Sequence, residues 1–319
     1  MKQTNRAAPS SAGRMHMNRI EHLFQMLQKE VPGLELREKE LMSRHTTFRV
    51  GGPATLMALP DTEEKLLAAV RISRSEGIEP LFIGMGSNLL VDDDGLDTFV
   101  IKTAPQLNAF SVDGVRITAL AGTPLVQIAN AAADHGLTGL EFAHGIPGSL
   151  GGAVTMNAGA YDGEMRQVVK SVRVLDKNNK VYDIPTEECN FRYRHSLFSD
   201  SEFLVLSAVI ELKLGDENAI RARMAELMAK RKEKQPLEWP SAGSTFKRPE
   251  GYFAAALIDQ CGLKGLSLGG AQVSEKHAGF VINTGDATCS DILALMNQVR
   301  ERVLAETGVT LEPEVKYLR

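Results

Sequence analysis

The chain has 319 residues and a mass of 34.7 kDa, which is enough for two or three domains of ~100–200 residues each. Its 36 basic and 40 acidic residues give a net charge of −4, without the basic excess typical of nucleic-acid-binding proteins. No apolar run approaches the ~18 residues of a membrane-spanning helix. The three widely separated cysteines indicate reduced thiols rather than disulfides or a zinc cluster. We therefore expect a cytoplasmic protein that binds neither nucleic acid nor a membrane.

The first 18 residues are predicted to form a disordered tail. They contain basic but no acidic residues, and they lack the apolar core of ~7–15 residues that a secretory signal needs. An amphipathic helix is expected over 19–30, because Pro32-Gly33 would end it. Asp61 stands three residues before Glu64 in a pattern that resembles a capping box, which predicts a second helix to about residue 76.

Short apolar runs between turn residues predict strands around 80–83, 89–91, 99–101, 115–120, 172–175, 180–184 and 204–214. A helix is expected to open at Thr123-Pro124 and to end at His135-Gly136. The last third of the chain predicts helices at 217–234, 252–261 and 286–307 and strands near 278–282 and 315–318. The basic run 230–232 is interpreted as a solvated helix face, in preference to a site that steers anions.

The first glycine-rich segment follows the strand expected at 80–83 and consists of Gly84, Met85, Gly86, Ser87 and Asn88. Its N–H groups could close around a phosphate, since glycine adopts positive φ and lets the backbone approach a ligand. The segment is neither a Walker A nor a Rossmann motif, because a third glycine is missing and a strand follows it. A phosphate site and a tight structural turn therefore stay open as alternatives.

The second segment is denser and comprises Gly145, Ile146, Pro147, Gly148, Ser149, Leu150, Gly151 and Gly152. A stretch with so little bulk or charge makes a poor surface loop and a poor core. We expect its backbone to lie flat against a large ligand such as a nucleotide cofactor, in preference to a close crossing of two backbone segments.

Three polar residues stand in short motifs further along the chain, namely Arg194, Ser244 and Glu314. Taken singly, each has a structural explanation as a surface cation, a turn hydroxyl or an exposed strand acid. Ser244 lacks the Gly-x-Ser-x-Gly elbow of serine hydrolases. The histidines show no metal-ligand spacing, so no metal site is expected.

Taken together, the motifs resemble those of the UDP-N-acetylenolpyruvoylglucosamine reductase family, which are flavoproteins of peptidoglycan precursor synthesis. They occur in the family's order at 47–54, 84–88, 145–152, 193–196, 242–247 and 312–315. Each motif is weak alone, whereas the ordered series is specific. The resemblance implies an α+β protein with a vanillyl-alcohol-oxidase-type (PCMH-type) FAD-binding region and a substrate-binding domain. The expected divisions are FAD-binding subdomains over 19–105 and 106–214, followed by the α+β substrate-binding domain over 215–319.

The resemblance also implies an oxidoreductase that acts on a CH–CH group with NADP. NADPH would pass a hydride to FAD, and the reduced flavin would pass one to the vinyl carbon of the enolpyruvyl ether of UDP-N-acetylglucosamine. The product would be UDP-N-acetylmuramate. By matching motif, Ser244 is the proton donor, and Arg194 and Glu314 complete the catalytic set. A guanidinium matches a carboxylate with two parallel hydrogen bonds, whereas Glu314 could donate to that carboxylate only if a dry site raised its pKa.

The two glycine-rich segments would hold the phosphates and the isoalloxazine of FAD. Neither contains histidine or cysteine, so noncovalent FAD is expected. The substrate contacts expected from the resemblance are Asn157, Tyr161, Lys247 and His277, with Lys247 near the pyrophosphate. The short stretch between Arg194 and Ser244 resembles a compact subclass without a substrate-capping loop, and a monomer is expected.

Two alternatives stay open at this point. One is an oxidase of alcohols or sugars with the same cofactor fold, in which FAD is often tethered to histidine or cysteine. The other is a nucleotide-sugar-binding protein that catalyses no reaction. A flavin spectrum would separate this second alternative from both enzymes.

Overall fold

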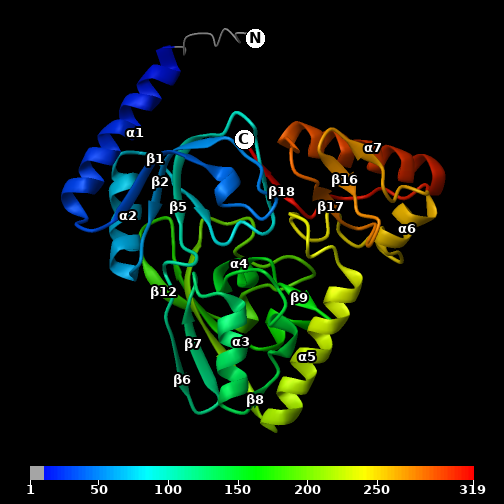
Figure 1. Ribbon diagram of the computed structural model, residues 1–319. Helices are drawn as coiled ribbons and strands as arrows, with labels where there is room; N and C mark the ends of the chain where they lie inside the picture. Colours follow the sequence, from blue (N-terminus) through cyan, green and yellow to red (C-terminus); the bar gives the residue numbers. More distant parts are fainter. Residues whose placement is uncertain (1–10) are drawn as a thin grey trace.

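The computed structural model describes residues 11–319, with side chains from residue 19 onward. Its α-helices are α1 Ser11–Glu30, α2 Glu63–Ser75, α3 Leu125–Asp134, α4 Leu150–Thr155, α5 Glu217–Lys234, α6 Ala254–Gln260 and α7 Cys289–Thr307. None of these helices has both the length and the hydropathy needed to cross a membrane. Figure 1 shows the arrangement along the chain.

The strands of the first half are β1 Glu35–Leu41, β2 Pro53–Leu59, β3 Leu81–Ile83, β4 Leu89–Val91, β5 Leu96–Lys102, β6 Phe110–Asp113, β7 Arg116–Leu120 and β8 Leu137–Thr138. The others are β9 Gly159–Ala160, β10 Gly163–Glu164, β11 Val169–Leu175, β12 Val181–Pro185, β13 Leu204–Glu211, β14 Lys213–Leu214, β15 Ser267–Leu268, β16 Ala271–Val273, β17 Val281–Asn283 and β18 Lys316–Leu318. Short 3₁₀ turns connect several of them.

The N-terminal sheet has the order β1-β2-β5-β3, in which β1 is antiparallel to β2 and the other pairs are parallel. Helices α1 and α2 lie beside this sheet (Figure 1), and Leu23 and Leu66 from these helices share a buried core with Phe99 of β5. Helix α1 begins at Ser11 rather than at residue 19. The predicted disordered tail therefore overlaps the helix over 11–18, and residues 1–10 lie outside the described residues.

The start of α2 also differs from the prediction. Its N-cap is Thr62, whose hydroxyl accepts a hydrogen bond from the Lys65 N–H at 3.2 Å. Asp61 instead forms an ion pair with the Lys65 ammonium at 2.7 Å. Thr62 caps the helix in place of Asp61 because its extended backbone presents the hydroxyl to the free N–H groups of the first turn.

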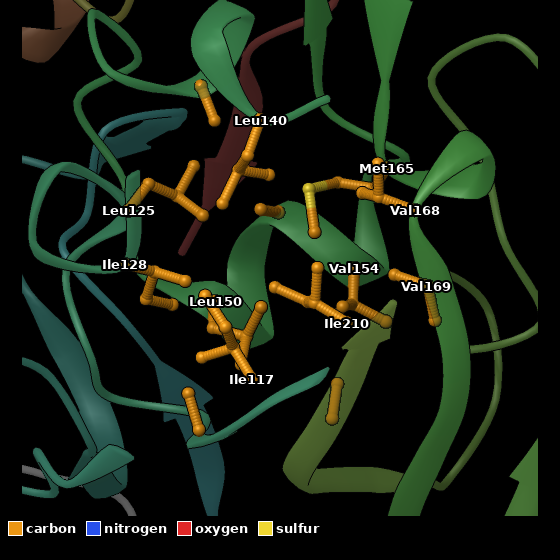
Figure 2. Packing of buried hydrophobic residues seen from close by; sticks show 14 of the residues in the cluster. Ile117, Leu125, Ile128, Leu140, Leu150, Val154, Met165, Val168, Val169 and Ile210 are labelled. Atoms are coloured by element: carbon orange, nitrogen blue, oxygen red, sulfur yellow. The ribbon is translucent and has the colours of Figure 1, made fainter. Parts of the chain in front are cut away.

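The second sheet is antiparallel throughout, with the order β12-β11-β13-β7-β6. Strands β11 and β12 form a hairpin, since they pair on either side of the turn at 176–179. Helix α4 packs on β7 and β13. Figure 2 shows Leu150 and Val154 of this helix among the side chains of Ile117, Leu125 and Ile210. The second glycine-rich segment is therefore anchored at its end by a buried helix.

The C-terminal unit combines the sheet β15-β16-β17 with helices α6 and α7. It does not end as a separate body, because β18 crosses back and pairs in parallel with β4 of the first half. Figure 1 shows this last strand beside the N-terminal elements. The expected domain boundaries at 105 and 214 stay a prediction. Through its pairing with β4, strand β18 connects the part of the chain after residue 214 with the part before residue 105.

Asp93 makes a second contact between the first half of the chain and the C-terminal unit. Its carboxylate accepts hydrogen bonds from the N–H groups of Cys289 at 2.7 Å and Ser290 at 3.0 Å, and from the Ser290 hydroxyl at 3.0 Å. These groups form the first turn of α7. A carboxylate placed there satisfies unpaired donors and complements the helix dipole.

Substituting Asp93→Ala should therefore lower the free energy of unfolding by about 0.5–2 kcal/mol, the usual effect of losing a capping side chain. The Thr288–Asp291 capping box of α7 stays intact in this variant, which limits the loss. The measurement is the midpoint of urea denaturation. Asp94→Ala is the matched control, since it removes an exposed neighbouring carboxylate. Equal midpoints for the two variants would contradict the capping role.

Candidate active site

A cleft of about 690 Å³ lies where the parts of the chain meet. Arg194, Ser244 and Glu314 all line it, although they are far apart in the sequence. The glycine-rich segments also line it, through Gly84, Met85, Gly86, Ser87, Asn88, Ile146, Pro147, Gly148, Ser149, Gly151 and Gly152. Gly145 lies outside this lining. The motifs that were singled out separately thus converge on one place.

The loop 84–88 follows β3 and is held against the segment before β2. Gly86 has a φ of +67°, and a Cβ there would lie 2.0 Å from the carbonyl oxygen of His45. Glycine is therefore required by both backbone conformation and space. Among residues 11–319, the N–H groups of Met85, Gly86 and Ser87 donate to no protein acceptor. Three free donors in a tight loop fit an anionic group of a ligand.

The second glycine-rich segment crosses another backbone segment closely and also borders the cleft. Gly151 crosses another backbone closely, because its N–H bonds the carbonyl of Ala121 at 2.8 Å and a Cβ would lie 2.9 Å from the Ala121 Cβ. A Cβ on Gly148 or Gly152 would meet only ordinary contacts, at 3.8 and 3.7 Å. These two glycines line the cleft without a packing need on the protein side. Their small size suits a flat ligand.

Ser149 stands between these glycines as the N-cap of α4. Its side chain makes no capping hydrogen bond, and its buried hydroxyl has no partner within the described part of the chain. A buried hydroxyl without a partner is costly. Because Ser149 lines the cleft, a ligand that enters the cleft can supply the missing partner. The free donors and the small residues therefore fit a dinucleotide such as FAD.

Arg194 sits in a tight loop with a φ of 52°, and the neighbouring residues Arg192 and His195 form an isolated bridge. Its Nε lies 2.8 Å from Oε1 of Glu314. The Nε–H group is not aimed at that oxygen, however, and has no hydrogen-bond acceptor among residues 11–319. Nη2 donates to the carbonyl of Gly159 at 3.3 Å. The guanidinium is thus held near a carboxylate but keeps donor capacity for a ligand.

Glu314 is fixed by its backbone on both sides. Its N–H donates to the carbonyl of Thr245 at 2.8 Å, and its own carbonyl accepts from the Asn88 amide at 3.0 Å. Burial raises the pKa of the Glu314 carboxyl, while the charges of Arg194 and Lys247 oppose this rise. The raised pKa agrees with the expectation for a carboxyl that must be able to hold a proton.

Ser244 follows Gly243, which has a φ of +77°. The next residue anchors the segment, because the Thr245 N–H donates to the carbonyl of Gly279 at 2.8 Å and its hydroxyl accepts from the Val281 N–H at 2.9 Å. Ser244 itself is exposed in the cleft. A well-anchored segment therefore presents a hydroxyl to the open space beside Glu314.

The four expected substrate contacts do not line this cleft. Asn157 is buried, and its amide donates to the Glu164 carboxylate at 2.8 Å and to the carbonyl of Arg192 at 3.0 Å. It therefore supports the loop that carries Arg194. Tyr161 also lies outside the cleft lining, and its backbone has a positive φ of 51°.

Lys247 forms an ion pair with Glu312 and lines a neighbouring pocket of about 390 Å³. The ring of His277 packs edge-on against Phe280, with centroids 5.0 Å apart. Phe280 does line the main cleft, so His277 lies one layer behind it. Within residues 11–319, no group of histidine, cysteine or acidic side chains is placed to hold a metal ion.

Arg231 was missed by the sequence interpretation, which placed the run 230–232 on a solvated face. Lys230 does pair with Glu226 at 2.6 Å on the outside of α5. Arg231 instead lines the cleft, forms no ion pair with a carboxylate in the described chain, and has its pKa lowered by burial. The helical period could have revealed this, because Arg231 stands four residues after the buried Leu227.

Comparison with known proteins identifies the family. Residues 235–318 match a family described as "UDP-N-acetylenolpyruvoylglucosamine reductase, C-terminal domain", and residues 54–184 match one described as "FAD binding domain". A UDP-N-acetylenolpyruvoylglucosamine reductase of Caldanaerobacter subterraneus is 49% identical over 88% of this chain and 92% of its own length. A reductase of the same name from Clostridioides difficile is 46% identical, covering 93% and 96% of the two chains.

A solved structure agrees with these relatives. The crystal structure of UDP-N-acetylenolpyruvylglucosamine reductase from Thermus caldophilus superposes with a TM-score of 0.77 at 36% identity. The match covers 90% of this chain and 99% of the other. The predicted α+β class and the vanillyl-alcohol-oxidase-type FAD-binding region are thereby confirmed. This chain belongs to the UDP-N-acetylenolpyruvoylglucosamine reductase family.

Proposed function

We propose that this cleft reduces the enolpyruvyl ether of UDP-N-acetylglucosamine to UDP-N-acetylmuramate, with NADPH as the source of the hydride. The observation that carries the proposal is the convergence of Arg194, Ser244 and Glu314 with both glycine-rich segments in one cleft. Each turnover adds one hydride and one proton across the carbon–carbon double bond, and NADPH becomes NADP⁺. The chain is an FAD-dependent oxidoreductase of peptidoglycan precursor synthesis.

The residues present fit FAD. The free N–H groups at 85–87 suit its diphosphate, and Gly148, Ser149 and Gly152 suit the flat ring system. When bound, FAD accepts the hydride from NADPH and delivers a hydride to the vinyl carbon of the substrate. Among the described residues that line the cleft there is neither histidine nor cysteine. This composition favours noncovalent FAD and disfavours the oxidase with tethered flavin.

Arg194 is suited to bind the carboxylate of the enolpyruvyl group. Hydride addition pushes negative charge into that carboxylate, and a preorganised guanidinium stabilises charge as it develops. Glu314 lies 2.8 Å away, and its raised pKa favours the protonated form. A protonated Glu314 can donate a hydrogen bond to the same charge. With Glu314 protonated, the pair would supply a cation and a neutral donor at one place.

We assign delivery of the proton to Ser244. Its hydroxyl is exposed in the cleft on a segment that bonds to Gly279, Val281 and Glu314. Serine is a weak acid in water, but the charged intermediate of the substrate is a strong base, so a positioned hydroxyl is sufficient.

We place the reaction in the cytoplasm, on a monomer. All three cysteines are free, which agrees with a reducing compartment.

The first prediction concerns the cofactor. FAD should be released completely by acid precipitation, because no residue type that forms a covalent flavin link lines the cleft. The measurement is the flavin absorbance of the supernatant against that of the pellet. Yellow colour in the pellet would support the oxidase alternative, and a colourless purified protein would support the binding protein without catalysis.

The second prediction is that Arg194→Lys severely slows transfer from the reduced flavin to the substrate. An ammonium keeps the charge but loses the planar two-pronged contact with a carboxylate. Bleaching of the flavin by NADPH should be largely unaffected. Arg192→Lys is the matched control, since Arg192 stands in the same loop and contacts His195 at 3.4 Å. Near-normal turnover of Arg194→Lys would show that Arg194 is only a structural cation.

The third prediction tests the proposed function most directly. In Ser244→Ala, NADPH should bleach the flavin at about the wild-type rate, because that half-reaction does not use the hydroxyl. Reoxidation by anaerobic substrate should slow by ~10²–10⁴-fold, the usual contribution of a positioned acid. Ser244→Cys should recover part of this loss, because a thiol can also donate a proton. Rapid-mixing absorbance at the flavin band measures both phases.

Ser241→Ala is the matched control for this experiment. Ser241 stands in the same segment but does not line the cleft, so its loss should leave both phases unchanged. Equal slowing of both phases in Ser244→Ala would indicate a displaced cofactor. Unimpaired reoxidation would remove Ser244 from the mechanism.

A further inference from the structure

A row of four charged and polar side chains runs from the buried Lys102 and His45 to the partly exposed Arg37. Nζ of Lys102 lies 3.0 Å from Nδ1 of His45, and Nε2 of His45 lies 2.8 Å from Oε1 of Glu40. Arg37 completes the row, with Nη1 3.2 Å from the same oxygen of Glu40. Lys102 is 8% exposed and His45 is 7% exposed. None of these four residues lines the cleft.

The contacts along the row fit a charged Lys102 beside a neutral His45. An ammonium has donors only, so Nδ1 of His45 must accept the hydrogen bond from Lys102. The ring proton then sits on Nε2 and is donated to the Glu40 carboxylate. Burial lowers the pKa of His45, which agrees with this neutral ring. The charge of Glu40 is shared with Arg37, so Lys102 contacts no carboxylate directly.

The position of the row relates it to the loop. Lys102 ends β5 and pairs with Ile83, the last residue of β3. Side chains of paired residues lie on the same face of a sheet, and Ile83 lines the cleft. The loop begins at the next residue. His45 touches the loop as well, since a Cβ on Gly86 would lie 2.0 Å from its carbonyl oxygen.

A buried ammonium without a carboxylate is unfavourable for folding. Burial lowers the pKa of Lys102, and the nearby charge of Arg37 lowers it further. Within residues 11–319, His45 is the hydrogen-bond partner of this ammonium, and two of its three N–H groups bond to no protein acceptor. The free N–H groups of Met85, Gly86 and Ser87 belong to the loop that follows Ile83, the strand partner of Lys102. A charge kept at such a position is explained if an anion binds to this loop.

We infer that Lys102 is the buried counter-charge for the diphosphate of FAD at the loop 84–88, and that His45 is the positioning residue that holds its ammonium there. The inference rests on the proposed assignment of this loop to the diphosphate. It places a specificity element for the dinucleotide outside the cleft lining. Such a counter-charge would favour the binding of FAD over that of riboflavin, which has the same ring system but no phosphate.

The experiment titrates FAD and riboflavin separately into the full chain after removal of FAD, with quenching of flavin fluorescence as the signal. In Lys102→Met, the Kd for FAD should rise by about tenfold or more, the effect of one partly screened charge. The Kd for riboflavin should change less than about twofold, because that ligand carries no charge for Lys102 to meet. The thermal midpoint of the FAD-free chain should stay the same or rise, since an unfavourable buried charge has been removed.

Lys170→Met is the matched control, because it removes one exposed lysine from β11 in the other sheet. It should alter neither Kd. His45→Phe should weaken FAD binding selectively by releasing the ammonium, and His45→Gln, which keeps an acceptor, should restore most of the affinity. These two variants test the inference even where Lys102→Met does not fold.

Three results would overturn the inference. Equal loss of FAD and riboflavin affinity in Lys102→Met would show that the lysine supports only the fold. An unchanged Kd for FAD would show that its charge does not act on the cofactor. A wild-type chain that binds riboflavin as tightly as FAD would remove the diphosphate assignment itself, and this result is visible before any variant is made.

Discussion

The parallel pairing of β18 with β4 is the contact on which the cleft depends. It places Glu314, two residues before β18, against Asn88, whose amide bonds the Glu314 carbonyl at 3.0 Å. The Glu314 N–H in turn bonds the carbonyl of Thr245, next to Ser244. A chain of hydrogen bonds, through the side chain of Asn88 and the backbone of Glu314, therefore connects the first glycine-rich loop with two catalytic candidates. Asp93 at the start of α7 supports the same interface from the other side.

The cleft is lined by three basic side chains, Arg194, Arg231 and Lys316, and by three carboxyls, Glu79, Glu202 and Glu314. Glu314 lies beside Arg194, and burial raises the pKa of this carboxyl. Lys102 adds a further positive charge next to the first glycine-rich loop. Protonation of Glu314 would leave the lining with one more positive than negative charge, although the whole chain carries a formal net charge of −4. A diphosphate cofactor and an anionic substrate both match such a site.

Local patterns predicted most elements, whereas long-range contacts had to be seen in the structure. Helix α5 begins after the Asp216 cap and has the expected bounds, because capping and helical period are local signals. The ordered motifs also identified Arg194, Ser244 and Glu314 as one set. No local signal shows that β18 pairs with β4, or that the amide of Asn157 is consumed by Glu164 and a backbone carbonyl. Such partners are set by tertiary packing.

Several unfavourable features of the fold lie in the cleft or next to its first glycine-rich loop. Ser149 has a buried hydroxyl without a partner, the Nε–H of Arg194 has no aligned acceptor, and Lys102 is a buried cation. The packed cluster around α4, by contrast, contains close apolar contacts of the kind that stabilise a core. A ligand that satisfies the donors at the cleft removes these costs only in the folded state. Binding therefore stabilises the fold by mass action, and the groups that destabilise the empty cleft are the ones that recognise its ligand.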